Sequence, residues 1–194
     1  YQAAGADARH TNCCLTYSSH LGGGGERDMI IIAYNHRGLA PSGVAPLGAI
    51  GVALYDAFSR GEVRLTSIDP EAQPIVDENM LDHPADRLRL RDGVRRLTRL
   101  CTLTPIAQLA DIIMFGDSAL SMTEAAALED DALDALMLTE AGDIQHAAGT
   151  CRMTAHEDPR GVVDPDLRVR GVAGLRIADA SIMPTDCRAN LHFT

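Results

Sequence analysis

Residues 29–34, Met-Ile-Ile-Ile-Ala-Tyr (MIIIAY), form the most strand-like stretch of this chain. Isoleucine is branched at Cβ, and branched side chains pack well on a pleated surface but lose rotamer freedom in a helix. A short apolar run of this kind is typical of a buried strand. We therefore predict that residues 29–34 form such a strand, and that the fold is built around it.

The flanking segments indicate which partners this strand has. Residues 49–58 (AIGVALYDAF) are apolar enough for a second strand, and residues 61–69 (GEVRLTSID) alternate apolar and polar side chains as a half-exposed strand does. Residues 1–27 read as irregular, and residues 36–48 as a loop spaced by proline and glycine. Together these segments predict an antiparallel sheet.

Beyond Pro84 the apolar residues recur at helical spacing and predict one long amphipathic helix. Its other face carries arginines with acidic residues among them, and we interpret that face as solvated. A second helix is expected from Ser121, where Glu124 completes a capping box, to Gly142. Short strands are expected at 167–171 and 175–179, so the predicted fold class is α+β, an antiparallel sheet flanked by helices. The arginines assigned to that face are Arg89, Arg91, Arg95, Arg96 and Arg99.

Charge and composition exclude several classes of protein. The chain has 17 Lys and Arg against 27 Asp and Glu, a formal net charge of -10. An acidic chain does not neutralise phosphates, so we expect neither a nucleic-acid partner nor binding to an anionic membrane surface. No apolar run approaches the roughly 20 residues that span a bilayer, and the first residues do not resemble a signal peptide. The predicted location is the cytoplasm.

Two groups of residues resemble ligand sites but lack the required order. The tetraglycine of residues 21–25 (LGGGG) precedes a strand, whereas phosphate-binding glycine loops lie between a strand and a helix, so we predict a flexible surface loop there. Four possible metal ligands have irregular spacing that matches no common zinc pattern, and we interpret them as structural. These four residues are His10, Cys13, Cys14 and His20.

Residues 145–153, QHAAGTCRM, place a histidine shortly before a glycine. Imidazole has an ordinary pKa of about 6.5 and can accept a proton near neutral pH. Taken alone, His146 is more often a structural histidine than a catalytic one, because most histidines are not catalytic. The motif by itself leaves both interpretations open.

Read together, QHAAGTCRM (145–153), GVVDPDLRVRGVAGLRIADASIMP (161–184) and RANLHFT (188–194) resemble the C-terminal portion of the glucose-methanol-choline (GMC) flavoprotein oxidoreductases. Residues 59–97 also resemble the substrate-domain segment of that family. The resemblance covers most of residues 59–194 and favours the catalytic interpretation of His146.

The resemblance implies a mechanism and two catalytic residues. Family enzymes oxidise an alcohol to an aldehyde or ketone by passing a hydride to flavin N5 while a base takes the hydroxyl proton. His146 matches the family histidine that serves as this base, and Asn190 matches its second catalytic position. An amide can hold the substrate oxygen but cannot act as a base, so the base role falls to His146.

The same resemblance implies which residues lie next to the FAD cofactor. Asp179 and Ala180 match the turn that approaches the ribityl and pyrophosphate part of FAD, and the small side chain of Ala180 allows a close backbone approach. Leu191, His192 and Phe193 match residues close to the flavin. His192 is a wall residue that could compete for the base role.

The chain departs from the family pattern in two places. Thr154 stands where the family has glycine, which predicts a differently shaped turn. The G-x-G-x-x-G element that grips the ADP half of FAD is absent from the sequence, so we expect the chain to work with an N-terminal FAD-binding half, from the same precursor or a separate chain. In this interpretation residues 1–142 form the substrate-binding domain, and residues 143–194 complete an FAD-binding α/β domain.

Two alternative functions remain at the level of sequence. Some members of the superfamily are hydroxynitrile lyases that keep FAD without using it for turnover. Alternatively, the chain is a non-catalytic substrate-binding fragment or subunit. The sequence favours oxidation of a small-molecule alcohol, with oxygen or another acceptor reoxidising the flavin.

Overall fold

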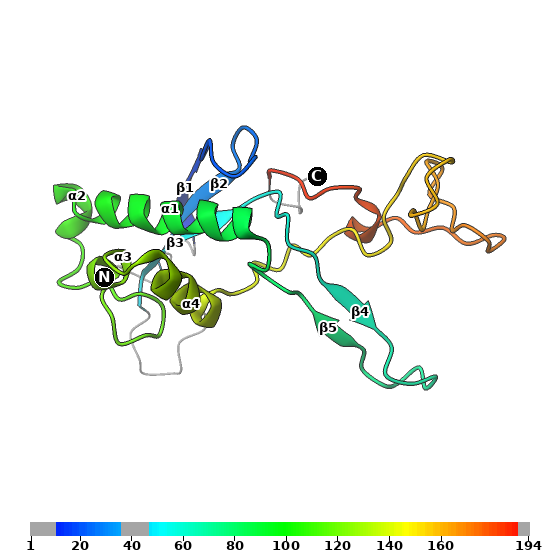
Figure 1. Ribbon diagram of the computed structural model, residues 1–194, viewed down its shortest axis with the longest axis horizontal. Helices are drawn as coiled ribbons and strands as arrows, with labels where there is room; N and C mark the ends of the chain where they lie inside the picture. The colour runs from blue at the N-terminus through cyan, green and yellow to red at the C-terminus, as the bar shows by residue number, and fades with distance from the viewer. Residues whose placement is uncertain (1–10, 36–46, 190–194) are drawn as a thin grey trace. The chain divides into compact units, whose positions relative to one another are not determined.

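The computed structural model describes residues 11–35 and 47–189, which form two compact units (Figure 1). Unit 1 contains residues 1–54 and 83–141, and unit 2 contains residues 55–82 and 142–194. Unit 2 therefore contains residues 55–82, which sequence analysis assigned to the substrate-binding domain, together with the C-terminal segment. The division of a whole enzyme at 142/143 stays a prediction.

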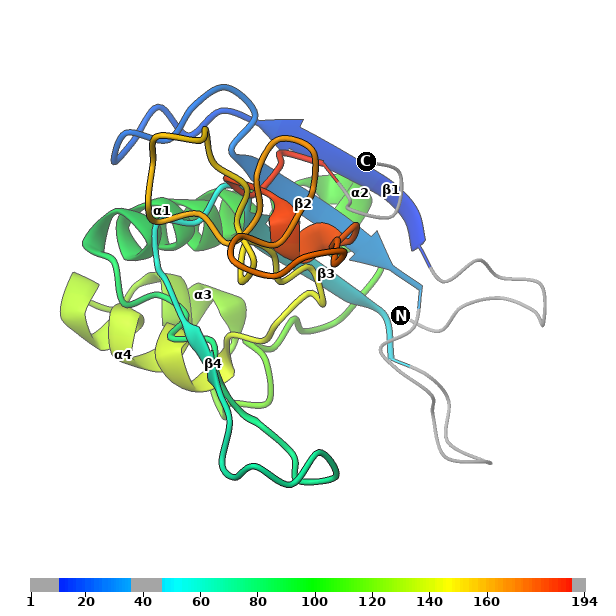
Figure 2. The same ribbon diagram turned by 90° about the vertical axis from the view of Figure 1, so that its right-hand side faces the viewer.

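Unit 1 is built on a three-stranded antiparallel sheet with β2 (Met29–Tyr34) in its centre (Figure 2). β2 pairs with β1 (Thr11–Tyr17) on one side and with β3 (Ala49–Leu54) on the other. The predictions of a buried strand at 29–34 and of a second strand from residue 49 are confirmed. The prediction that residues 1–27 are irregular was wrong for Thr11–Tyr17, because β1 is stabilised by pairing with β2.

Helix α1 (Pro84–Cys101) covers one face of this sheet and confirms the predicted long helix. It begins where the side chain of His83 accepts a hydrogen bond from the Ala85 N–H, with Pro84 in the first turn, where proline is tolerated. At Gly93 the helix lies so close to the sheet that a Cβ atom there would be 2.9 Å from both Met29 Cε and Val52 Cγ2. Glycine thus permits the close packing of helix on sheet.

The arginine face of α1 was predicted to be solvated, but Arg89 on this face is fully buried. Its Nη1 atom lies 3.4 Å from Asp28 Oδ2, and its Nη2 atom donates to Asp86. Asp28 also accepts hydrogen bonds from the backbone N–H and hydroxyl of Ser19, at 2.7 and 2.6 Å. Gly24 lies against this network, since a Cβ there would be 2.1 Å from Asp28 Oδ2. Part of the predicted surface loop therefore packs on a buried ion pair.

The predicted second helix is interrupted. Ser121 and Glu124 form the expected capping box of α3 (Met122–Ala126), but a new helix, α4 (Asp130–Glu140), starts after a break. At the break, the guanidinium of Arg95 donates to the carbonyls of Ala126 and Leu128 at 3.4 and 3.1 Å. A side chain from α1 thus replaces the helical partners that these carbonyls would otherwise have.

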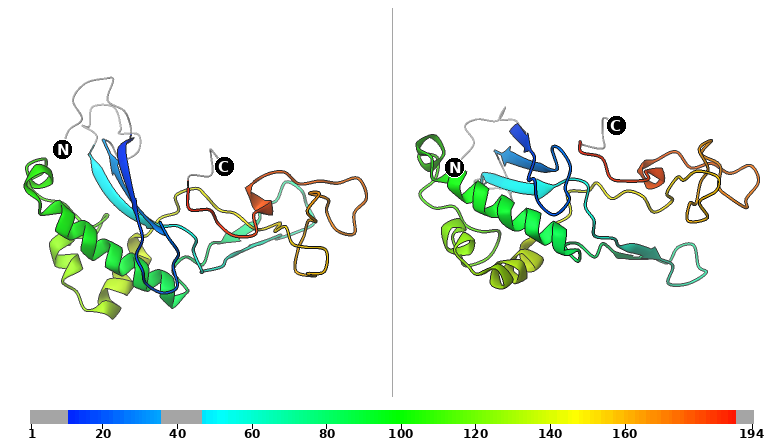
Figure 3. Two further views of the ribbon diagram at one scale, coloured as in Figure 1. Left: turned by 90° about the horizontal axis from the view of Figure 1, so that it is seen from above. Right: turned by 45° about the horizontal axis from the view of Figure 1, so that its top comes forward.

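These helices form a second layer over α1. α1 contacts β2 and β3 on one side and α3 and α4 on the other (Figure 3). The short helix α2 (Thr104–Ala107) connects α1 to this layer. Within the described part of the chain, no helix combines the length and apolar character needed to cross a membrane.

Unit 2 has little regular structure. β4 (Glu62–Arg64) pairs with β5 (Ile75–Asp77) in a separate two-stranded sheet, so only part of the predicted strand 61–69 forms, and it does not join the sheet of unit 1. The prediction of strands at 167–171 and 175–179 was wrong, because these segments form only isolated bridges, such as the one between Arg168 and Arg176. A single 3-10 turn, η1 (Ala180–Ile182), follows them.

Candidate functional site

His146 lies in unit 2, in the loop formed by residues 142–148, and its side chain is half-buried. The carboxylate of Asp143 accepts a hydrogen bond from the Gln145 N–H at 2.7 Å. Gln145 itself has a φ of 62°, in the left-handed region that residues other than glycine rarely adopt. A defined turn therefore fixes the backbone immediately before His146.

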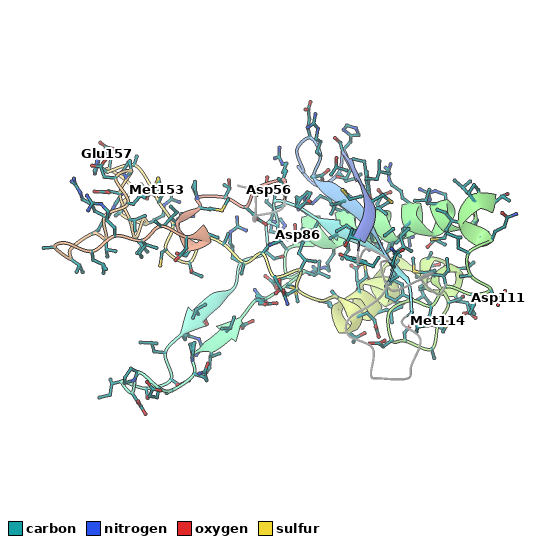
Figure 4. The ribbon with its side chains drawn as sticks, turned by 180° about the vertical axis from the view of Figure 1, so that it is seen from behind. Asp56, Asp86, Asp111, Met114, Met153 and Glu157 are labelled. Carbon is teal, nitrogen blue, oxygen red and sulfur yellow. The ribbon has the colours of Figure 1, made fainter. Side chains whose placement is uncertain are left out.

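The chain that follows His146 is joined by backbone hydrogen bonds to the turn η1. The N–H groups of Gly149, Cys151 and Met153 donate to the carbonyls of residues 180, 181 and 182 at 3.2, 2.8 and 2.8 Å. We call these three hydrogen bonds the motif ladder. Figure 4 labels Met153, which is the last donor of the ladder. The structure thus brings together the histidine loop and the DAS turn, two of the three elements that carry the family resemblance.

Gly149 has a conformational role in this arrangement. Its φ is 84°, and a Cβ atom there would lie 3.2 Å from the carbonyl oxygen of Met183. The chain after η1 turns back toward residues 142–148 at this point (Figures 1 and 3). Glycine therefore serves both the left-handed backbone and the close approach of the returning chain.

Asp179 caps the turn η1 rather than pointing to a remote partner. Its carboxylate accepts a hydrogen bond from the Ser181 N–H at 2.8 Å, and the hydrogen bonds from Ser181 lower the pKa of Asp179. The predicted FAD neighbours Asp179 and Ala180 are therefore held in a fixed turn.

Sequence analysis missed Asp186, a half-buried carboxylate in the returning chain. Burial raises its pKa, and the nearby carboxylate of Asp56 raises it further, whereas the backbone N–H of Cys187 and the charges of His146 and Arg60 lower it. The returning chain passes close to the His146 loop three residues before Asp186, where the Met183 carbonyl oxygen would lie 3.2 Å from a Cβ atom added at Gly149. No spacing rule marks this aspartate, because its neighbour His146 lies 40 positions earlier in the sequence.

Sequence analysis also missed an ion pair that fixes the returning chain. Arg188 Nη2 lies 2.8 Å from Asp56 Oδ2, and the two residues are 132 positions apart (Figure 4 labels Asp56). Asp56 has a φ of 53°, another left-handed residue that is not glycine. The segment just before Asn190 is thereby attached to the start of unit 2.

The turn at Thr154 is closed by the side chain of Arg170, and its difference in shape from the family turn stays a prediction. Arg170 Nη2 donates to the Thr154 hydroxyl at 2.9 Å and to the Thr154 and Ala155 carbonyls at 3.1 and 2.7 Å. The carboxylate of Asp164 accepts from the N–H groups of Asp166 and Arg168, both at 2.9 Å, and so closes a turn there. Hydrogen bonds from and to side chains therefore replace part of the backbone pairing that was expected in this region.

The remaining predicted site residues cannot be placed. Asn190, the second catalytic position, and the predicted FAD neighbours Leu191, His192 and Phe193 lie outside the described residues, as does His10. Among the residues that are described, no group of three or more His, Cys, Asp or Glu side chains could hold a metal ion.

Comparison with known proteins identifies curated relatives that are more than a third identical to this chain over most of its length. An uncharacterized GMC-type oxidoreductase of Mycobacterium bovis is 36% identical over 154 residues, which cover 77% of this chain and 28% of that protein. The oxygen-dependent choline dehydrogenase of Sinorhizobium medicae is 37% identical over 141 residues, 69% of this chain and 23% of that protein. The chain thus spans about a quarter of the length of the curated relatives it matches.

Solved structures and sequence profiles agree with these relatives. The crystal structure of pyridoxine 4-oxidase from Mesorbium loti matches 98% of this chain and 36% of that chain, with a TM-score of 0.78 and 19% identity, a likeness of fold alone. The sequence profile of the GMC oxidoreductase C-terminal domain matches residues 57–194. Because that match covers most of the chain, the protein belongs to the GMC oxidoreductase family.

Proposed function

We propose that this chain forms the catalytic C-terminal part of an FAD-dependent enzyme that oxidises an alcohol to an aldehyde or ketone. The observation that supports this most is the motif ladder, which joins the His146 loop to the Asp179–Ile182 turn. A relative at 37% identity is named a choline dehydrogenase, which supports a CH–OH group as the substrate. The chain would act as an oxidase or dehydrogenase on a small molecule.

In this proposal His146 is the base. Its half-buried ring is reachable by a small molecule, and imidazole can accept a hydroxyl proton near neutral pH. The nearby Asp186 carboxylate would offset the positive charge that the ring gains with the proton. Asn190 would hold the substrate oxygen through its amide as negative charge develops there.

The described residues are compatible with FAD. Among them, no group accepts a hydrogen bond from the Ala180 N–H, and the side chain at that position is a single methyl group. Asp179 and Ala180 would therefore hold the cofactor through the backbone, and Leu191, His192 and Phe193 would lie near its ring system. When bound, FAD would accept the hydride from the alcohol carbon.

Further parts of the enzyme are needed for this activity. An N-terminal FAD-binding half, from the same precursor or a separate chain, would supply the helix N-terminus that binds the pyrophosphate. Residues 143–194 would complete that FAD-binding domain, and residues 1–142 would supply substrate-binding surface. A cytoplasmic location fits these assignments and stays a prediction.

An anaerobic spectrum tests the proposal. The flavin-loaded enzyme that contains this chain is mixed with choline and with other primary and secondary alcohols in the absence of oxygen. Loss of the oxidised flavin absorbance with at least one alcohol is the expected result. An unchanged oxidised spectrum, together with release of cyanide from a hydroxynitrile, would instead assign the protein to the lyases.

A further inference from the structure

Five charged or titratable side chains of unit 2 come together from three segments of the chain. We call them the His146 cluster. The motif ladder and the close approach of the Met183 carbonyl oxygen to Gly149 bring the His146 and Asp186 segments together, and the Arg188–Asp56 ion pair at 2.8 Å attaches the third segment. The members of the cluster are Asp56, Arg60, His146, Asp186 and Arg188.

Asp186 has no evident structural reason to be a carboxylate. The hydrogen bond that the described residues give it comes from the N–H of Cys187, the next residue, at 3.0 Å, so it ties no distant segment. Burial disfavours its charged form, and Asp56 adds repulsion. An acid kept in such a place costs stability, and perturbed acids of this kind are concentrated at functional sites.

The ion pair between Asp56 and Arg188 is better suited to positioning than to stability. Its side chains are 23% and 40% exposed, and exposed pairs contribute at most about 1 kcal/mol. Its geometric effect is larger, because it joins residues 132 positions apart and lies two residues from Asp186. Without it, the returning chain beyond Met183 would have fewer attachments to unit 2.

We infer that the Asp56–Arg188 ion pair keeps the Asp186 carboxylate beside His146, and that Asp186 is a positioning residue for the base. The carboxylate orients the imidazole ring and stabilises the imidazolium that forms when a ring nitrogen takes the hydroxyl proton. No bond to Asp186 forms or breaks, and the proton stays on His146. This inference rests on the proposed function of His146 as a base.

The first test measures the coupling between the two side chains in the full chain, without flavin. Carbon-13 NMR follows the Asp186 carboxyl through its titration, in the presence of the charges of Asp56, Arg60 and Arg188. We expect the pKa of Asp186 to lie above that of an ordinary aspartate, and to rise further in His146→Gln, which removes a positive charge that lowers it. An unchanged pKa in His146→Gln would overturn the inference.

The second test removes the ion pair. In Arg188→Gln the effect of His146→Gln on the pKa of Asp186 should shrink, because the carboxylate is no longer kept in place. The reversed pair Asp56→Arg with Arg188→Asp should restore the effect, which separates loss of positioning from loss of folding. Arg168→Gln is the matched control, since Arg168 pairs with Asp166 at 3.6 Å elsewhere in unit 2. Full coupling in Arg188→Gln would contradict the role of the ion pair.

The third test uses the flavin-loaded enzyme. Asp186→Asn should lower kcat by at least about tenfold with little change in KM, because in this inference Asp186 acts through His146 and not on the substrate, and Asp186→Glu should recover part of the loss. Wild-type kcat in Asp186→Asn would overturn the inference. Failure of the proposed function has a different signature, namely wild-type turnover in His146→Ala while the NMR coupling persists.

Discussion

Asp28 and Asp186 are both withdrawn from solvent, but their surroundings act on them in opposite directions. For Asp28, burial raises the pKa, yet the hydrogen bonds and charge of Ser19 and Arg89 lower it more, so the net shift is downward. For Asp186, burial dominates and the net shift is upward. At the scale of single residues, one carboxylate therefore supports the fold and the other opposes it.

Replacing Asp28 should destabilise the chain strongly. Asp28→Asn leaves the buried Arg89 with less negative charge, and breaking a buried pair costs about 3–5 kcal/mol. Because the pKa of Asp28 is lowered by folding, its contribution is present above the unfolded pKa of about 3.9 and is lost as the pH falls through the folded value. Urea unfolding at pH 7 and at lower pH measures both effects.

Asp92→Asn is the control for this prediction, because Asp92 pairs with Arg96 on the same helix at 26% and 42% exposure. It should change the unfolding free energy by less than about 1 kcal/mol. Equal effects of the two substitutions would show that the buried network has no special role.

Replacing Asp186 should have the opposite sign. Folding raises its pKa, so its favourable contribution is present below the unfolded pKa and is lost as the pH rises through the folded value. Above its folded pKa the charged carboxylate opposes folding, and Asp186→Asn should then raise the Tm of the full chain while lowering turnover. A lower Tm in this variant above that pKa would show that Asp186 is held by interactions that favour its charge.

Sequence identifies some of these residues and not others, for physical reasons. His146 became a strong candidate only together with the Asp179–Ser181 turn, and the structure places those two elements side by side. Asp56 and Asp186 carry no local signal, because their partners are distant in sequence. The burial of Arg89 was also missed, since helical periodicity alone cannot show which arginine meets a buried carboxylate.

At the scale of elements, the motif ladder depends on Gly149. Gly149→Ala should destabilise the chain for two reasons, a strained φ of 84° and a Cβ atom 3.2 Å from the Met183 carbonyl oxygen. Gly171→Ala is the matched control, with a φ of 77° and nothing within 4 Å of the added Cβ. The left-handed backbone alone costs about 1–2 kcal/mol, so both variants should lose that and Gly149→Ala more. Equal losses in urea unfolding would show that the close approach at Met183 is unimportant.

Elements with a strong local pattern were predicted well. β2 and α1 follow from residue type and periodicity, and the capping box at Ser121 marks the start of α3. β1 depends on pairing with β2, and the break before α4 depends on Arg95, so neither is visible locally. The bridged segments after Asp164 resemble strands in sequence, but some of their backbone N–H groups donate to a side chain, that of Asp164, instead of to a neighbouring strand.

At the scale of the whole molecule, the chain should bind FAD poorly by itself. It has no G-x-G-x-x-G element, and the groups proposed to hold the cofactor are a short backbone turn and a few neighbouring residues. We expect the purified chain to be colourless and to retain flavin only when combined with the N-terminal FAD-binding half. A yellow chain that retains equimolar flavin by itself would contradict the claim that FAD binding needs the N-terminal half.

The most direct test of the central claim is the rate of anaerobic flavin reduction by an alcohol in the wild-type enzyme and in His146→Ala, measured by stopped flow across a range of pH. His156→Ala, which removes an exposed histidine of the same unit, is the control. If His146 is the base, its loss should slow reduction by about 10²–10⁴-fold and remove the rise of the rate with pH, and His156→Ala should match the wild type. A wild-type rate in His146→Ala would contradict the account.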